Sequence, residues 1–127
     1  MDDYIARYLT EVQCVAGNID PSQIEQIIEY LVQVRDEHGR VFFLGVGGGA
    51  GNATHAVNDF RKIADIECYT PTDNVSELTA RVNDEGWEGV FVSWLRTCKL
   101  SDKDAVFVFS VGAVSYTHLT LPTNREV

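Results

Sequence analysis

Two amphipathic helices are predicted at the start of the chain. Apolar residues recur at helical spacing over residues 4–15, which predicts a first helix ending near Gly17. Asp20 then offers an N-cap, Pro21 stands at the first helical position, and a second apolar stripe runs to a stop at residues 38–39. The two stripes consist of Tyr4, Ile5, Tyr8, Leu9, Val12 and Val15, and of Ile24, Ile27, Ile28, Leu31 and Val34.

A buried strand, a glycine-rich turn and a third helix follow. Residues 40–44 read RVFFL, a nearly continuous apolar run that is typical of a strand covered on both faces of a parallel sheet. The glycine-rich run at 45–51 comes next, and one apolar helical face is formed by Ala53, Ala56, Val57 and Phe60. Strand, turn and helix in this order predict a doubly wound α/β fold.

The remaining pattern predicts two more strands and two short helices. We expect a second strand at 63–69, a helix at 75–82 capped by 72–74, a helix at 87–97 and a third strand at 105–109. Three parallel strands are few for such a fold, and the pattern stops after the third. We therefore expect a domain that is incomplete at its C-terminus.

The end of the chain has no helix or strand pattern. VSYTHLTLPT at 114–123 corresponds, residue for residue, to a translation of the transposon-end adapter used in sequencing libraries. We therefore expect one domain at 1–112 and a non-native tail at 113–127, in which His118 has no function.

The charge of the chain indicates which partners are disfavoured, and its cysteines indicate the redox state of the thiols. The formal charge of −9, with acids spread along the chain, disfavours nucleic acid and anionic membranes as partners. The three cysteines are widely separated and lack metal-site spacing, which indicates reduced thiols. Without a leader-like start or a long apolar run, we expect a cytoplasmic protein.

The glycine-rich run allows three interpretations. Backbone N–H groups at a helix N-terminus bind anions, and glycine lets a ligand approach closely. The spacing Gly45-x-Gly47-x-x-Ala50, with Asp65 or Glu67 roughly 20 residues on, also fits a loose dinucleotide fingerprint. The third interpretation is a tight turn with a structural role only.

Polar side chains follow the first two predicted strands. One face of the third helix carries Asn52, His55 and Asp59. A histidine and a carboxylate one turn apart act as base and acid, bind a metal, or form a solvated pair worth about 0.3 kcal/mol. Asp73 opens a polar segment at the carboxyl end of the second strand, where α/β folds bind ligands, although helix capping is the simpler explanation.

Three stretches in order resemble the SIS (sugar isomerase) domain family, and within it the phosphoheptose isomerases. They read GRVFFLGVGGGAGNATHAVNDF, PTDNVSELTARVNDEGWEGVF and AVFVFSVG, and the likeness covers about residues 1–112. The resemblance implies a three-layer α-β-α sandwich with a parallel sheet, assembly into homodimers or homotetramers, and a sugar phosphate bound at the carboxyl ends of the strands. The isomerases interconvert aldose and ketose phosphates through an enediol, which requires a base.

The resemblance also implies roles for individual residues. Asp59 stands where these enzymes carry a catalytic glutamate, and His55 where they carry a histidine that joins it in holding zinc in some members. Zinc is therefore the cofactor that we consider. Asp73 matches an aspartate near the active site, and Ser110 matches the first hydroxyl of the phosphate-binding loop. The other substrate-binding candidates are Gly47, Gly48, Gly49 and Asn52.

Some positions depart from the family pattern. Val46 and Gly49 replace an asparagine and a serine of the first loop, and residues 111–112 replace hydroxyl-bearing residues of the phosphate loop. The identity of the sugar stays open. The alternatives to an isomerase are a phosphosugar-binding module without turnover and a dinucleotide-binding domain.

Overall fold

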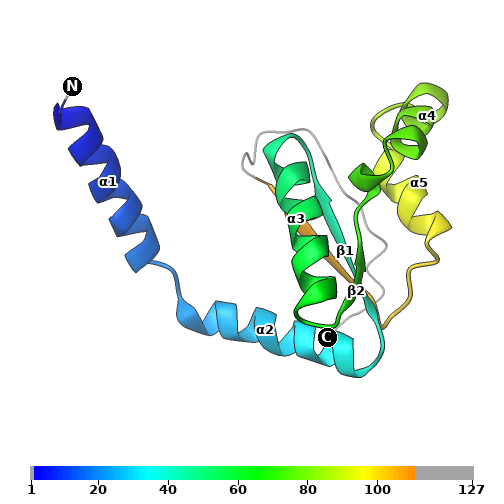
Figure 1. Cartoon of the computed structure of the whole chain (residues 1–127), viewed down its shortest axis with the longest axis horizontal. Helices are drawn as coiled ribbons and strands as arrows, with labels where there is room; N and C mark the ends of the chain where they lie inside the picture. Colours follow the sequence, from blue (N-terminus) through cyan, green and yellow to red (C-terminus); the bar gives the residue numbers. More distant parts are fainter. Residues whose placement is uncertain (1, 111–127) are drawn as a thin grey trace. The chain divides into compact units, whose positions relative to one another are not determined.

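Parallel strands form the centre of the fold. The computed structural model describes residues 2–110. Both neighbours of the central strand run parallel to it, in the order β2-β1-β3. The α/β class with a parallel sheet is thereby confirmed. The elements are α1 (Asp2–Gly17), α2 (Pro21–Asp36), β1 (Arg40–Gly45), α3 (Gly48–Lys62), β2 (Glu67–Tyr69), the 3₁₀ turn η1 (Pro71–Asp73), α4 (Val75–Glu85), α5 (Val90–Thr97) and β3 (Ala105–Phe109) (Figure 1).

The chain divides into two units between Val32 and Gln33. The first unit contains α1 and most of α2. The predicted start of α2 is confirmed, because Asp20 Oδ1 accepts a hydrogen bond from the backbone N–H of Ser22 at 2.9 Å. Among the described helices, none combines the length and the hydrophobicity that crossing a bilayer requires.

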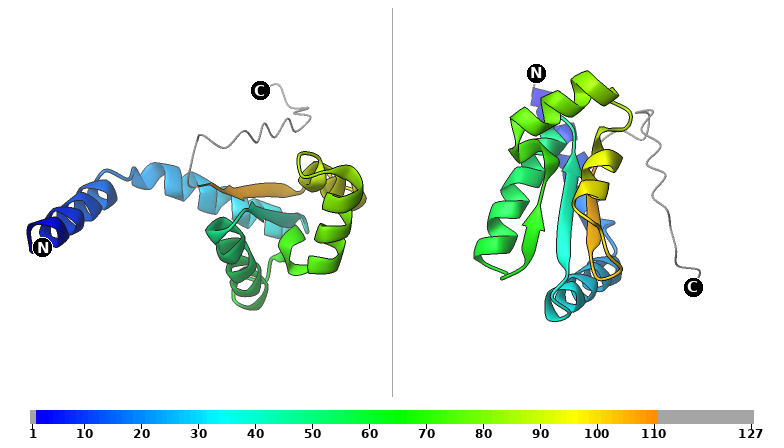
Figure 2. Two further views of the ribbon diagram at one scale, coloured as in Figure 1. Left: turned by 90° about the horizontal axis from the view of Figure 1, so that it is seen from above. Right: turned by 90° about the vertical axis from the view of Figure 1, so that its right-hand side faces the viewer.

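The second unit has three layers. Side chains along β1 alternate between the two faces of the sheet, and all of them from Val41 to Leu44 are at most 1% exposed. Phe43 packs edge-to-face on Phe60 of α3, with ring centres 5.1 Å apart, and Phe42 packs on Trp94 of α5 at 5.7 Å. The helices α3 and α5 therefore cover opposite faces (Figure 2). This packing explains why RVFFL is apolar at consecutive positions.

Three boundaries differ from the prediction. β2 begins at Glu67 rather than residue 63, because α3 continues to Lys62 and Asp65 takes a left-handed backbone conformation (φ 54°). α4 extends past residue 82 to its stop at Gly86 (φ 81°). α5 begins at Val90 rather than residue 87. The strand pattern at 63–66 came from apolar residues that lie in a turn.

A buried ion pair ties β3 to β1 at the amino edge of the sheet. Arg40 Nη2 lies 2.7 Å from Asp104 Oδ2, and the carboxylate is 2% exposed. The same guanidinium donates to the carbonyl oxygens of Cys98 and Lys99. Burial alone would raise the pKa of Asp104, but hydrogen bonds from Arg40 and Ser101 outweigh it and hold that pKa below its usual value. This contact fixes the loop that leads into β3.

Candidate functional site

The turn between β1 and α3 is shaped by three glycines with different roles. Gly47 has φ 58° and ψ −121°, a conformation open to glycine only. A Cβ at Gly45 would lie 2.3 Å from the backbone of Gly49, and one at Gly49 would lie 2.7 Å from the carbonyl oxygen of Phe109. The start of α3 is therefore packed directly against the carboxyl ends of β1 and β3.

Two backbone donors are free at this turn. The N–H groups of Gly49 and Ala50 already donate to Val46 and Gly47 within the turn. Those of Gly47 and Gly48 donate to no acceptor in the described part of the chain. Free donors at the first turn of a 15-residue helix suit an anion such as a phosphate.

Ser110 lies at the same edge of the sheet. Phe109, the residue before it, is the register partner of Gly45 at the carboxyl end of β1. Ser110 is exposed, and it directly follows Phe109, whose carbonyl oxygen packs against Gly49 of the turn. The phosphate-loop positions at 111–112 lie outside the described residues. The structure thus brings Ser110 together with the glycines that were assigned to the same ligand.

The interpretation that Asp73 caps α4 is wrong. The cap is Asn74, whose side-chain oxygen accepts from the N–H of Glu77 at 3.0 Å. Asp73 instead accepts a hydrogen bond from the hydroxyl of Thr54 at 2.8 Å, and both residues are exposed. This contact links the segment after β2 to α3 and leaves Asp73 Oδ2 without a hydrogen-bond donor among the described residues.

Thr54 is a residue of the candidate site that the sequence analysis missed. It stands beside His55 on α3, and nothing in the spacing distinguished it from other exposed helix residues. Its role depends on η1 folding back toward α3, which is a long-range contact. The only signal for Thr54 in the sequence was that a hydroxyl-bearing residue directly precedes His55.

His55 and Asp59 form a pair on the surface of α3. His55 Nε2 lies 3.2 Å from Asp59 Oδ2, and the two side chains are 77% and 43% exposed. The amide of Asn58 donates to the other oxygen of Asp59 at 3.1 Å. Asn52 is exposed two turns earlier on the same helix. His55 and Asp59 therefore form the predicted pair, and the pair is solvated.

The helical rise per residue gives the distance of each candidate residue of α3 from the glycine turn. At about 1.5 Å per residue, Thr54 lies about 9 Å along the axis from Gly48, and Asp59 about 16 Å. An extended seven-carbon chain, with C–C bonds of about 1.5 Å, spans about 8 Å. A sugar phosphate with its phosphate on the turn therefore reaches the level of Thr54 and Asp73, but not Asp59 of the same chain.

The described residues do not by themselves make a zinc site. Within residues 2–110 no group of three or more histidine, cysteine, aspartate or glutamate side chains could hold a metal ion. A catalytic zinc takes three protein ligands, and His55 with Asp59 supplies two. We therefore derive no step through zinc.

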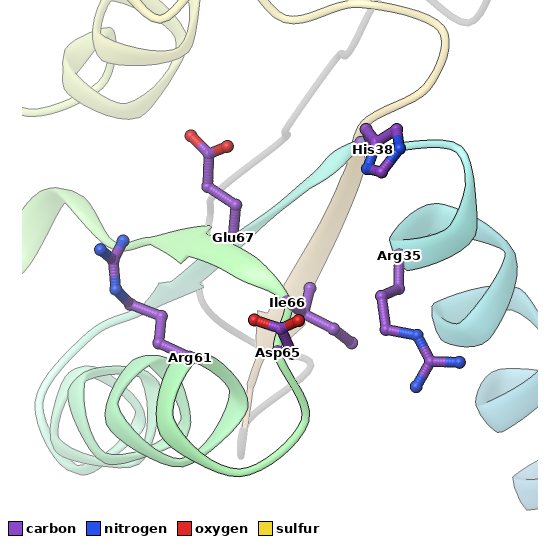
Figure 3. Close-up of a pocket in the computed structure, with 7 residues that line it drawn as sticks. Arg35, His38, Arg61, Asp65, Ile66 and Glu67 are labelled. Carbon is purple, nitrogen blue, oxygen red and sulfur yellow. The ribbon is translucent and has the colours of Figure 1, made fainter.

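A groove of about 400 Å³ lies at the opposite, amino edge of the sheet. Its lining consists of Arg35, His38, Gly39, Arg61, Asp65, Ile66 and Glu67, several of which are drawn in Figure 3. None of the residues predicted to bind a sugar phosphate or zinc lines it. Open α/β sheets bind ligands at their carboxyl ends, so we place the candidate site at the glycine turn rather than in this groove.

The positions of Asp65 and Glu67, which line this groove, do not fit the dinucleotide interpretation. In a dinucleotide fold the ribose-binding acid follows the second strand at the carboxyl edge. Asp65 precedes β2 and Glu67 is its first residue, so both lie at the edge away from the glycine turn. Neither carboxylate is placed to bind the ribose of a nucleotide whose phosphates rest on that turn.

Comparisons with known proteins support the fold. No protein-family model matches the chain, and no curated protein matches it either. Among solved structures, the phosphoheptose isomerase GmhA from Neisseria gonorrhoeae is similar over 87% of this chain, with a TM-score of 0.74 and 24% identity. The chain spans 61% of the length of that protein. The likeness shows a shared SIS-like α/β fold.

Proposed function

We propose that this domain binds a sugar phosphate at the carboxyl edge of its sheet, as part of an aldose–ketose isomerase of the phosphoheptose isomerase type. One observation carries the proposal: the free N–H groups of Gly47 and Gly48, with Ser110 beside them, lie about 9 Å along α3 from the Thr54–Asp73 pair. That spacing suits a phosphate at one end and sugar hydroxyls at the other. The fold shared with a phosphoheptose isomerase supports it.

In this proposal the two ends of the ligand meet different groups. The phosphate accepts hydrogen bonds from the two glycine N–H groups and from the hydroxyl of Ser110, and the positive end of α3 adds favourable electrostatics. A sugar hydroxyl donates to the free oxygen of Asp73. The other oxygen of Asp73 is held by Thr54 at 2.8 Å, which fixes the direction of the carboxylate.

The isomerisation step needs a base that moves a proton between adjacent carbons. Asp59, paired with His55, has the chemistry for this role. Because Asp59 lies about 16 Å from Gly48, the carboxylate that meets the sugar belongs to a second copy in a homodimer or homotetramer. The carboxylate takes the C–H proton of one carbon and returns it to the neighbouring carbon, while a second proton passes from the hydroxyl oxygen of the first carbon to the carbonyl oxygen of its neighbour, so atoms and charge balance.

A second candidate is a phosphosugar-binding module without turnover. The exposure of His55 and Asp59, together with their distance from the turn, favours it, because both residues are then an ordinary solvated pair. The two candidates share the phosphate site and differ only in the role of Asp59.

Ligand-induced thermal stabilisation tests the binding proposal. Sedoheptulose 7-phosphate at about 100 times its dissociation constant should stabilise the protein by about 2.7 kcal/mol, whereas the unphosphorylated sugar and NAD should not. Gly47→Ala should weaken this effect, because the turn cannot keep φ 58° with a Cβ. No stabilisation by any sugar phosphate would refute the proposal.

Turnover then separates the two candidates. Asp59→Asn should abolish isomerisation while the ligand still raises the melting temperature, and Asp36→Asn, at another exposed carboxylate, should leave both unchanged. Stabilisation without isomerisation in a version extended to the complete domain would establish the binding module. An active Asp59→Asn variant would remove that carboxylate from the mechanism.

A further inference from the structure

Two threonine hydroxyls are in contact where the chain leaves β2. Thr70 Oγ1 and Thr72 Oγ1 lie 3.1 Å apart, which is a hydrogen-bond distance, and the distance alone allows either hydroxyl to be the donor. Thr70 is buried, with 4% of its surface exposed, whereas Thr72 is partly exposed. The contact therefore joins a hydroxyl that is shielded from water to one that water or a ligand can reach.

This hydroxyl pair lies on the side of the sheet that α3 covers. The thiol of Cys68 in β2 donates to the carbonyl oxygen of Val57 in α3. Thr70 continues the extended backbone of that strand (φ −139°, ψ 141°), and side chains two positions apart on a strand share a face. Asp73 also contacts α3. Thr72 therefore belongs to the carboxyl edge at which we place the sugar phosphate.

Burial decides which of the two hydroxyls donates. Within residues 2–110 the hydrogen-bond partner of Thr70 Oγ1 is Thr72 Oγ1 alone, and a buried hydroxyl hydrogen needs an acceptor. If Thr72 donated, the hydrogen of Thr70 would be buried without an acceptor, which is unfavourable. If Thr70 donates, the hydrogen of Thr72 can still reach solvent. Thr70 is therefore the donor, and the hydrogen of Thr72 remains available to a ligand.

Thr72 and Asp73 offer a donor and an acceptor on consecutive residues of η1. Thr72 supplies an O–H whose oxygen is held in place by Thr70. Asp73 supplies Oδ2, which receives no donor from the described residues, because Thr54 binds the other oxygen. An ionised carboxylate can only accept. A ligand that satisfies both residues has an accepting oxygen next to a donating one.

An open-chain sugar carries such a pair of oxygens at the two carbons that isomerise. Its carbonyl oxygen only accepts, and the hydroxyl on the neighbouring carbon donates. We propose that Thr72 donates to the carbonyl oxygen of the open-chain sugar phosphate while Asp73 accepts from the neighbouring hydroxyl. The assignment rests on the proposed function and specifies the form of the sugar that the site binds. Because negative charge develops on the carbonyl oxygen as the C–H proton leaves, this hydrogen bond strengthens in the transition state.

The dependence of the melting temperature of the full chain on ligand concentration tests the binding. Thr72→Val keeps the shape of the side chain and removes the donor, so the affinity for sedoheptulose 7-phosphate should fall about fivefold to tenfold. Thr72→Ser retains the hydroxyl and should bind as the wild type does. The matched control is Thr79→Val, at an exposed threonine that bonds within its own helix, and it should leave the affinity unchanged. Inorganic phosphate should bind all of these variants equally.

A double variant separates ligand binding from stability. Thr72→Val leaves the buried hydroxyl of Thr70 without an acceptor, so the melting temperature of the ligand-free protein should fall. Thr70→Val/Thr72→Val removes both hydroxyls, and replacing both partners by apolar groups of the same shape is nearly neutral. The double variant should therefore regain the melting temperature and keep the weakened affinity. If it regained both, Thr72 would act only through the local fold, and the proposal would be refuted.

Kinetics of a version extended to the complete domain test the contact with the carbonyl oxygen. Thr72→Val should lower kcat on the order of 100-fold, as loss of one donor to a developing oxyanion does, and Thr72→Ser should restore most of it. An unchanged kcat in Thr72→Val would refute this contact. Equal stabilisation of the wild type and Thr72→Val by sugar phosphates would refute the role of Thr72 and leave the proposed function intact. A wild type that no sugar phosphate stabilises would refute both.

Discussion

Replacing the buried carboxylate of Asp104 should destabilise the fold far more than replacing an exposed one. Its carboxylate accepts five hydrogen bonds: from the N–H, Nε and Nη2 of Arg40, and from the N–H and hydroxyl of Ser101. The side chain is 2% exposed. Asp104→Asn preserves the shape, removes the charge and turns one acceptor into a donor. At least two of the five donors then lose their partner.

The magnitude follows from the burial of the pair. Breaking a buried ion pair by removing one partner costs about 3 to 5 kcal/mol. The Arg40 side chain is 26% exposed and keeps its bonds to the carbonyls of Cys98 and Lys99, so water and backbone offset part of that cost. We expect a loss of about 2 to 3 kcal/mol, which is a large fraction of the stability of a small domain.

Urea unfolding followed by circular dichroism measures this loss, and the chain offers a matched control. Arg35 and Asp36 form an ion pair at 3.1 Å with side chains 43% and 62% exposed, so Asp36→Asn should change the unfolding free energy by less than about 0.5 kcal/mol. Equal effects of the two substitutions would refute the argument that burial and the hydrogen-bond count of Asp104 decide its contribution.

The contribution of Asp104 should also depend on pH. Because the folded pKa of Asp104 is lowered, the unfolded chain binds more protons at this site, and stability rises with pH. The contribution is complete above the unfolded pKa of about 4 and is lost as the pH falls through the lower folded pKa. The gap between wild type and Asp104→Asn should therefore shrink in acid. A gap that stays constant below about pH 3 would contradict this assignment.

Three further predictions concern single sites. Burial raises the pKa of Cys68 to about 11, so a thiol reagent at neutral pH should modify exposed Cys14 in the folded protein and Cys68 only after unfolding. Gly45→Ala should destabilise the fold by about 2 kcal/mol or more, because its Cβ would meet backbone at 2.3 Å; Gly48→Ala, with nothing within 4 Å, should be nearly neutral in the same unfolding assay. Arg81→Met removes the bonds that join α4 to Ser93 and Thr97 of α5, and should cost about 1 kcal/mol in urea unfolding.

The sequence predicted elements well where a periodic pattern and a strong boundary signal coincide. Pro21 after a capping aspartate marked α2 correctly, and the apolar run at 40–44 identified the central strand. The prediction of a strand from the sequence was wrong at 63–66, where apolar residues follow α3 without forming a strand. A short apolar segment has no period of its own, so only packing decides whether it extends a strand or closes a turn.

The candidate site divides in the same way. The glycines of the turn were identifiable in sequence, because a strand followed by glycine and a helix places N–H groups at the carboxyl edge of any parallel sheet. The pairing of His55 with Asp59 also followed from helical spacing alone. The contact of Thr54 with Asp73 spans 19 positions and depends on how η1 folds against α3, which no local rule specifies.

What the sequence by itself determined is therefore local: helical faces, a doubly buried strand, a turn that only glycine fits and an apolar stripe on the first helix. Only the tertiary structure decided distances between elements, which place Ser110 beside the turn, Asp73 next to Thr54 and Asp65 at the opposite edge from the glycines. The physical reason is that periodicity and capping act within a few residues, whereas a binding site depends on the packing of segments far apart in the chain.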